Sequence, residues 1–548
     1  MKPEPVRADL LPRNASGHWI KVAVVSEQFR VSKVASWLFL PTSGPSWHCR
    51  CKPLGAHKCK RADRKKSLVV SMLSPAKAGQ AELRVVLYYQ TSVVQSLLVT
   101  ADVVDNPRVS GENRAVVDYN LTKRFADLSS VAPRALSVMM NDNGNGTHRL
   151  IFNGAKDKPV ALTLSDGQMS AALKVMRTVM RAIHIEEIGN SKTNRFDANN
   201  AKSLKGFVED LRTAAIEGAR LWHSLWEDRM DEWMDNESMF VTHSNIIHIA
   251  RKQKSTHVYP WAMVYDLPVD VGAPANNTLC KLLGATEWQA FQNATTFPNR
   301  CPFESSHGKN VICPFGFWGI RYQIEQPPSL PSRRERPSVI PAEPAPLDMI
   351  AALADDLDGK LLKAHLTKLA SHSAFRITEC RTRDAIRDGL GHAELELVYF
   401  YCHGLTNKLP GDAGETPVLG IGKQEMIHPP DLSTWLRTVW PKDHWKTVAP
   451  LVFINGCHTT DATPQTLVNF VDTFSGSLRA AGVIGTEITL HQLVANEVAQ
   501  VFLDAFKRAS VGDSLHVSRI GLLRKGNLLG LVYTAHCPAN LSLSSHLT

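Results

Sequence analysis

Two apolar segments in the C-terminal third of the chain end in the same dipeptide. Residues 395–403 and residues 449–458 both finish in Cys-His, and the run before each dipeptide is rich in β-branched and aromatic side chains. Such runs predict buried strands of a parallel sheet. Reactive groups gather outside the carboxyl ends of parallel strands, so we expect both dipeptides at one edge of that sheet. A thiol and an imidazole placed there have the chemistry of a nucleophile with its acid–base partner.

The dipeptides allow two working pairs, because neighbouring side chains on a strand point to opposite faces. One pair is His403 with Cys457, and the other is Cys402 with His458. Two further interpretations are open. The four side chains could bind zinc together, although the alternation along each strand makes four convergent ligands awkward. Both cysteines could also be inert thiols, which is the usual state of a buried cysteine.

The composition is that of a soluble globular protein. The 548 residues are 44% apolar and 21% charged, and their number predicts two or three domains. No apolar run is long enough to span a bilayer and none follows Met1 directly, so we expect a cytoplasmic protein without a membrane span. The ten cysteines are spread too thinly for a disulfide framework, which leaves them free, catalytic or metal-bound.

The net charge of +10 is concentrated near the N-terminus. Residues 1–70 hold 14 Lys and Arg against 4 Asp and Glu, so the rest of the chain is neutral overall. A nucleic-acid enzyme is expected to carry positive charge around its catalytic part as well. Nucleic acid is therefore a candidate partner of the N-terminal region only, and it is not the favoured one, because a solvated basic loop explains the same charge.

The first half of the chain has strand patterns followed by helical patterns. Residues 83–89 and 93–104 predict two strands joined by a short polar turn. A small antiparallel sandwich is the expected form of this β-rich region. Residues 168–186 and 200–235 have apolar positions at helical spacing and predict two helices.

A proline-rich segment marks the clearest boundary in the sequence. Residues 326–346 contain seven prolines and predict an extended connector. Helical and strand patterns alternate after it, beginning with a helix at 348–370 and a strand at 375–378. Such alternation predicts an α/β fold with a doubly wound parallel sheet.

The chain resembles the CHAT peptidases, which belong to the caspase-like (clan CD) cysteine proteases. Residues 398–404 are similar to the histidine motif of that family, residues 454–459 to its cysteine motif, and residues 481–486 to the strand that follows the nucleophile. Residues 259–266 resemble a signature of the pseudo-caspase half. The resemblance covers about 200–540.

The resemblance implies a caspase-like doubly wound sheet with a pseudo-caspase half and a catalytic half, preceded by a β-rich domain. It implies a cysteine endopeptidase that acts on protein substrates, with a regulatory protein partner and, in some relatives, a role in bacterial defence. The alternative is a catalytically silent scaffold of the same fold that binds partners or nucleic acid through its N-terminal module. The expected domains are a basic N-terminal module, a pseudo-caspase half, a proline-rich linker and a catalytic CHAT domain, at 1–115, 116–325, 326–346 and 347–548.

The resemblance also selects the site residues. His403 and Cys457 are the implied dyad, with Cys457 forming a thioester acyl-enzyme. The backbone N–H groups of Gly404 and Cys457 are the implied oxyanion hole. Glu487 and Asp461 are the candidate acids for binding a basic side chain of the substrate, and a solvated or capping acid is the alternative for each of them.

The chain departs from the family pattern at a few positions that hold no reacting atom. Asn455 and Gly456 precede Cys457 where the family usually has Ser-Ala, Ala262 replaces a usual Glu, and Ile488 stands where Trp is common. Residues 512–515 match an esterase motif, but they precede a predicted helix, so a role in capping that helix is preferred.

No cofactor is expected for the proposed chemistry, but two other groups of cysteines have enough donors for zinc. Loops with free thiols are the alternative in both cases. The first group is Cys49, Cys51 and Cys59 with His48 and His57, and the second is Cys280, Cys301 and Cys313 with His307.

Overall fold

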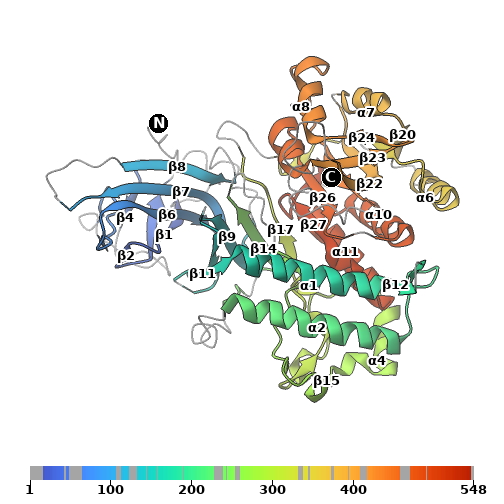
Figure 1. The fold of residues 1–548 in the computed structure, drawn as a ribbon, viewed down its shortest axis with the longest axis horizontal. Coiled ribbons are helices and arrows are strands. Elements are labelled where there is room, and N and C mark those ends of the chain that lie inside the picture. Colours follow the sequence, from blue (N-terminus) through green and yellow to red (C-terminus); the bar gives the residue numbers. More distant parts are fainter. Residues whose placement is uncertain are drawn as a thin grey trace. The chain divides into compact units, whose positions relative to one another are not determined.

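The computed structural model describes most of the chain, and its described residues form two compact units (Figure 1). The first unit draws on residues 1–163, 229–255 and 328–336, and the second on 164–228, 256–327 and 337–548. The described residues are 17–41, 45–48, 64–105, 113–121, 132–143, 145–156, 158–188, 191–226, 239–241, 244–252, 259–330, 337–342, 346–371, 375–392, 394–407, 416–456, 470–488 and 490–544.

The first unit contains an antiparallel sheet with the strand order β4-β3-β1-β6-β7-β8. A short antiparallel pair, β2 with β5, lies outside this sheet. The strands are β1 (His18–Val25), β2 (Arg30–Val31), β3 (Ala35–Leu40), β4 (Trp47–His48), β5 (Met72–Leu73), β6 (Gly79–Tyr89), β7 (Ser92–Val103) and β8 (Asn113–Asn120).

The prediction of two strands with a short turn within residues 83–104 is confirmed. β6 and β7 pair antiparallel from Tyr89 and Ser92 outwards. The two residues between them, Gln90 and Thr91, have φ angles of 46° and 70°. Positive φ at both positions is what a two-residue hairpin turn needs if it is to match the twist of its strands.

A second group of strands in the first unit has the order β11-β10-β9-β14. β9 and β10 form an antiparallel hairpin, and β14 pairs parallel with β9. Side chains from these strands, including Met139, Ile151 and Ala250, share one apolar cluster with Val86 and Tyr119 of the other sheet. The strands are β9 (Leu136–Asp142), β10 (Thr147–Asn153), β11 (Val160–Ser165) and β14 (Ile246–Arg251).

Two long helices begin the second unit, as the sequence predicted. α1 spans Asp166–His184, and Ser165 caps it by accepting the backbone N–H of Gln168 in a capping box. α2 spans Leu204–Trp226, and the rest of the predicted range, to 235, lies outside the described residues. A short hairpin of β12 (Ile185–Ile188) and β13 (Ser191–Asn194) separates the two helices.

The sheet of the second unit has the strand order β17-β27-β26-β25-β21-β19-β20. β20, β19, β21, β25 and β26 are parallel neighbours, β27 runs antiparallel to β26, and β17 is parallel to β27. The unit is therefore a mixed α/β structure with a parallel centre. The strands are β17 (Gln323–Glu325), β19 (Leu347–Leu353), β20 (Phe375–Cys380), β21 (Leu397–Tyr401), β25 (Leu451–Ile454), β26 (Gly482–Thr486) and β27 (Tyr533–His536).

Helices and small strand pairs complete the second unit. The helices are α4 (Ala285–Asn293), α5 (Trp318–Arg321), α6 (Gly359–Ser371), α7 (Arg383–Leu390), α8 (Pro429–Thr438), the π-helical η9 (Asp472–Leu478), α10 (Gln492–Phe506) and α11 (Val511–Arg524). The small pairs are β15 (Thr278–Leu279) with β16 (Val311–Ile312), and β18 (Val339–Ile340) with β28 (Ser542–Leu543). In the part of the chain that the structure describes, no helix is both long and apolar enough to cross a bilayer.

The single helix predicted at 348–370 is wrong. The structure has β19 in the first part of this range and α6 in the second, with a turn between them. The first part is rich in Ala, Leu and Met, which favour a helix when considered locally. In the fold these residues are buried almost throughout between β20 and β21, so the sheet determines their conformation.

A three-stranded antiparallel sheet between β21 and α8 was not predicted. It consists of β22 (His403–Asn407), β23 (Thr416–Ile421) and β24 (Glu425–Ile427). β22 begins two residues after β21 ends, so the chain changes from one sheet to another at Cys402. This change of direction is what places His403 outside the central sheet.

Candidate active site

The carboxyl ends of three parallel strands lie side by side in the second unit. β21 is the middle strand, with Leu353 of β19 paired to Tyr401 on one side and Ile454 of β25 paired to Phe400 on the other. The chain therefore leaves the sheet at neighbouring points after 353, 401 and 454. This is the edge at which an open α/β sheet places its reactive groups.

His403 lies just beyond the end of β21 and contacts a carboxylate from the next strand end. Its Nε2 atom is 2.8 Å from Oδ1 of Asp356, which belongs to the turn after β19. The imidazole side chain is 14% exposed, while the Asp356 side chain is 71% exposed. When Nε2 carries the proton donated to this carboxylate, Nδ1 is the basic nitrogen of the ring. Asp356 can thus fix both the tautomer and the orientation of His403.

Asp356 was missed in the sequence analysis. Asp356 falls inside the helix that was wrongly predicted at 348–370, and a residue inside that helix is not expected to lie near His403. The signal that could have found it is the pair Asp355–Asp356 directly after an apolar run, since acids after a buried parallel strand point to the same sheet edge.

Gly404 follows His403 in β22 and is buried. It pairs with Leu419 of β23, and His403 pairs with Gly420, so the hairpin fixes the backbone at both positions. The role of the Gly404 N–H as an oxyanion donor stays a prediction. Cys457, His458 and Asp461 lie outside the described residues.

The structure describes the residues directly before Cys457, and hydrogen bonds fix the position of Asn455 among them. Asn455 is fully buried, and its backbone N–H donates to the carbonyl of Phe400 at 2.8 Å. Its Nδ2 atom donates to the hydroxyl of Tyr399 at 2.9 Å and to the carbonyl of Ala495 at 2.8 Å. Its Oδ1 atom accepts the hydroxyl of Tyr533 at 2.8 Å. A buried amide with its donors and acceptor bonded in this way has one defined orientation.

Further buried polar groups extend this network from Tyr399. Nε2 of His365, on α6, lies 2.9 Å from the Tyr399 hydroxyl, and Gln500 on α10 lies 3.1 Å from Nδ1 of His365. Burial lowers the pKa of His365 to about 4, so its imidazole is neutral near neutral pH. The network ties α6 and α10 to β21 and β25, the two strands whose ends carry the predicted dyad.

The alternative pair, Cys402 with His458, has little geometric support from the described residues. Cys402 is fully buried at the point where the chain turns from β21 to β22. His403 is the member of this dipeptide that is partly exposed and contacts Asp356. An accessible imidazole with an orienting carboxylate fits acid–base chemistry better than a thiol without exposure.

Glu487, the predicted pocket residue, lies directly after β26. Its Oε1 atom accepts a hydrogen bond of 2.6 Å from the hydroxyl of Thr534. Burial raises the pKa of the Glu487 carboxyl, against the opposing effects of that hydrogen bond and of the positive charges of Arg177 and Arg519. These partners give Glu487 a structural role in the fold, and its role in substrate binding stays a prediction.

Comparison with known proteins gives one informative relative. A protein of Vitiosangium sp. (strain GDMCC 1.1324) that is named a probable protease is 30% identical to this chain over 521 residues. The match covers 90% of this chain, and the chain spans 65% of the length of that relative. No family model matches the sequence.

The similarity to solved structures is weak. Two crystal structures of the Saccharomyces cerevisiae separase–securin complex match with 10% and 11% identity and TM-scores of 0.35 and 0.34. Each match covers 74% of this chain and 30% of the other chain. What the comparisons establish is that most of this chain is similar to part of a protein named a probable protease.

Proposed function

We propose that this chain is a cysteine endopeptidase of the caspase-like CHAT type, with His403 and Cys457 as its dyad. The observation that carries the proposal is the contact of 2.8 Å between His403 and Asp356 at the end of β21. β25, whose end leads by three residues to Cys457, is the next parallel strand. The similarity to a protein named a probable protease supports the same reaction class.

In the proposed reaction, the Cys457 thiolate attacks the carbonyl carbon of the scissile peptide bond. The negative charge that develops on the carbonyl oxygen is stabilised by the N–H groups of Cys457 and Gly404. The C–N bond breaks as the imidazolium of His403 gives its proton to the leaving amine, and a thioester remains. A water molecule then gives a proton to His403 and attacks the thioester, which releases the carboxylic acid and restores the Cys457 thiolate beside the imidazolium.

Asp356 has a positioning role in this proposal. A carboxylate on one ring nitrogen holds the imidazole in one tautomer and stabilises the imidazolium that forms during the reaction. Asn455 has a comparable role for the nucleophile, since it fixes the backbone two residues before Cys457. Both roles act through the reacting residues, so their loss should lower kcat more than it raises KM.

The substrate is proposed to be a protein, with Glu487 and Asp461 favouring a basic side chain before the scissile bond. The proposal includes a regulatory protein partner and a role in regulated proteolysis or bacterial defence, both of which rest on the resemblance to CHAT peptidases. It also includes the cytoplasmic setting expected from the sequence. The doubly wound, caspase-like arrangement of the sheet is part of the same proposal, and the parallel centre from β20 to β26 supports it.

The test is cleavage of a peptide library by the full chain and by three variants. Cys457→Ala and His403→Ala should each abolish cleavage, whereas Cys380→Ala, which changes a buried thiol in β20, should leave it intact. Cleavage that survives in Cys457→Ala would overturn the assignment of the nucleophile. A well-folded wild-type chain without any cleavage would favour the alternative, a catalytically silent scaffold.

A further inference from the structure

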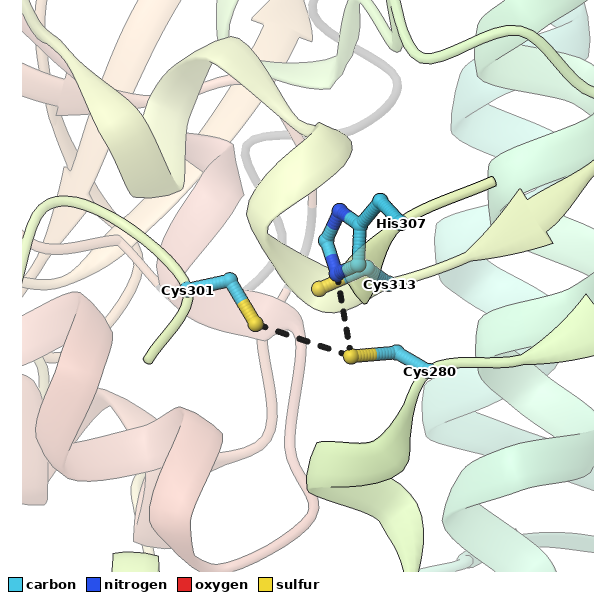
Figure 2. Close-up of side chains that lie close together, drawn as sticks. All are labelled: Cys280, Cys301, His307 and Cys313. Carbon is cyan, nitrogen blue, oxygen red and sulfur yellow. Dashed lines mark hydrogen bonds between the residues drawn. The ribbon is translucent and has the colours of Figure 1, made fainter. Parts of the chain in front are cut away.

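Three cysteines and one histidine meet in the second unit, far along the chain from the proposed dyad. The ligand atoms of Cys280, Cys301, His307 and Cys313 all lie within 4.8 Å of one another. Figure 2 shows their sulfur atoms and the ring nitrogen of His307 turned toward one centre. The three cysteines are buried and unpaired by disulfides, and the histidine is partly buried.

The local fold explains how residues so far apart in sequence converge. β15 and β16 are parallel, with Thr278 paired to Val311 and Leu279 paired to Ile312. Cys280 and Cys313 directly follow the two strands, so the pairing places them side by side. The other two ligands come from the segment between these strands, Cys301 after α4 and His307 at the end of the short 3₁₀ turn Glu304–Ser306.

The distances agree with a single tetrahedral ion. With zinc–sulfur bonds of about 2.3 Å, sulfur atoms in a tetrahedral site lie about 3.8 Å apart. Here the Sγ atoms of Cys280 and Cys301 are 3.5 Å apart, and Nε2 of His307 is 3.1 Å from Sγ of Cys280. The sulfurs of Cys280 and Cys301 also accept backbone N–H groups, from Leu282 and Phe303, at 3.4 Å each. Donors of this kind stabilise the negative charge of a metal-bound thiolate.

We propose that Cys280, Cys301, His307 and Cys313 form a structural zinc site. Soft sulfur ligands with one imidazole are a donor set that selects zinc, and hard cations such as Mg²⁺ and Ca²⁺ prefer oxygen. Four protein ligands occupy all the coordination positions of a tetrahedral ion, so the site has no open position for substrate or water. Its role is therefore to hold the fold.

The surrounding structure shows what a metal would hold together. The elements between residues 278 and 316 are short: strands of two residues, single 3₁₀ turns and the nine residues of α4. Elements of this size do not stabilise themselves. The backbone N–H of Cys313 donates to the hydroxyl of Tyr265 at 3.0 Å, which connects the site to the segment that resembles the family signature.

The first test is the zinc content of the full chain, measured by mass spectrometry after purification without chelators. The wild type should carry about one zinc at this site. Cys280→Ser and Cys313→Ser should each lose that equivalent, while Cys380→Ser, outside the cluster, should keep it. His307→Ala should weaken zinc binding and His307→Cys should restore it, because four thiolates are also a common structural set.

A second group of cysteines, Cys49, Cys51 and Cys59, requires its own control. Cys59→Ser should leave the equivalent assigned here in place. Zinc that is lost in Cys59→Ser and retained in Cys280→Ser would overturn the proposal. Cys457→Ala should keep its zinc, so failure of the proposed peptidase activity and failure of the zinc site are separate outcomes.

If the cysteine variants do not fold, the wild type still decides the matter. Cobalt substituted for zinc in the wild-type chain should give the absorption of a tetrahedral thiolate site, and chelation should lower Tm by at least about 5 °C. Protein that binds neither ion at micromolar concentration, or that contains a Cys280–Cys301 disulfide, would contradict the proposal.

Discussion

The side chain of Asn455 is hydrogen-bonded to the hydroxyl of Tyr399 at 2.9 Å, which joins the strand before Cys457 to the strand before His403. The family to which this chain shows resemblance usually has a small Ser at that position. Here the larger amide reaches three partners, on β21, β27 and α10. Asn455 therefore replaces a small residue with a buried amide that links the two strand ends, and we call this amide the brace.

Replacement of this brace should reduce both stability and activity. Asn455→Ala removes the amide that donates to the buried hydroxyl of Tyr399 and accepts from the buried hydroxyl of Tyr533, so we expect the free energy of unfolding to fall by about 1–3 kcal/mol. We also expect kcat to fall, because the backbone before Cys457 loses its anchor. Denaturant unfolding and steady-state kinetics measure the two effects.

The matched control for Asn455 is Asn496→Ala. Asn496 is a buried amide on α10 that bonds to the Tyr401 hydroxyl and to the carbonyl of Leu361, and neither of these partners belongs to β25. It should cost comparable stability and keep most of the kcat. Equal losses of kcat in both variants would show that Asn455 contributes only to general packing and does not position the nucleophile.

Asp356 should matter for turnover and hardly at all for stability. Because its side chain is 71% exposed, Asp356→Ala should change the free energy of unfolding by less than about 0.5 kcal/mol. Loss of the carboxylate that orients His403 should lower kcat on the order of tenfold or more, with KM little changed.

The neighbouring residue gives a sharp control for Asp356. Asp355 belongs to the same turn but bonds to Arg381 at 2.8 Å. Asp355→Ala should therefore leave kcat near its wild-type value. The same kinetic loss in both variants would show that the turn matters and that the contact with His403 does not.

Stability should fall in mild acid through His365. Burial lowers its pKa from 6.5 to about 4 in the folded chain, so between these values the unfolded chain binds a proton that the folded chain does not. The stabilisation is complete above pH 6.5 and is lost as the pH falls to about 4, for a total of about 3 kcal/mol. His365→Gln, which keeps a donor for Tyr399, should show a flatter pH dependence of the free energy of unfolding. Parallel curves for the two proteins would contradict this assignment.

Glu487 tests whether the proposed pocket is acidic. If its carboxylate receives a basic substrate side chain, Glu487→Gln should lower kcat/KM for substrates with Arg or Lys before the scissile bond, by about tenfold, and spare neutral ones. Asp461→Asn serves as the comparison for the second candidate acid. A loss of stability in Glu487→Gln without any change in selectivity would assign Glu487 to its contacts with Thr534 and the neighbouring arginines instead.

Local sequence patterns predicted much of the fold. The hairpin of β6 and β7, the two helices α1 and α2 and the strands β21 and β25 all have strong periodic or apolar signals, and the structure has them. The buried strand β19 does not carry such a signal, since its residues suit a helix locally and only their place between β20 and β21 makes them a strand. Because of that error, Asp356 was not predicted as part of the site. Its position near His403 follows from the place of β19 in the sheet and not from a local sequence pattern.

The proposed zinc ligands are a second case in which the sequence alone could not predict the tertiary arrangement. The sequence could list Cys280, Cys301, His307 and Cys313 as donors, but their spacing matches no common finger. The parallel pairing of β15 with β16, two strands of two residues each, brings the first and last together. Strands so short leave no periodic pattern in a sequence, so only the structure could show the convergence.

The central claim is that Cys457 is a nucleophile activated by His403, and covalent labelling tests it most directly. A peptidyl acyloxymethyl ketone should alkylate Cys457 in the wild-type chain, as located by peptide mass spectrometry. The rate should fall sharply in His403→Ala and remain unchanged in Cys380→Ala. Labelling that spares Cys457 while other cysteines react, or that proceeds equally fast without His403, would contradict the account.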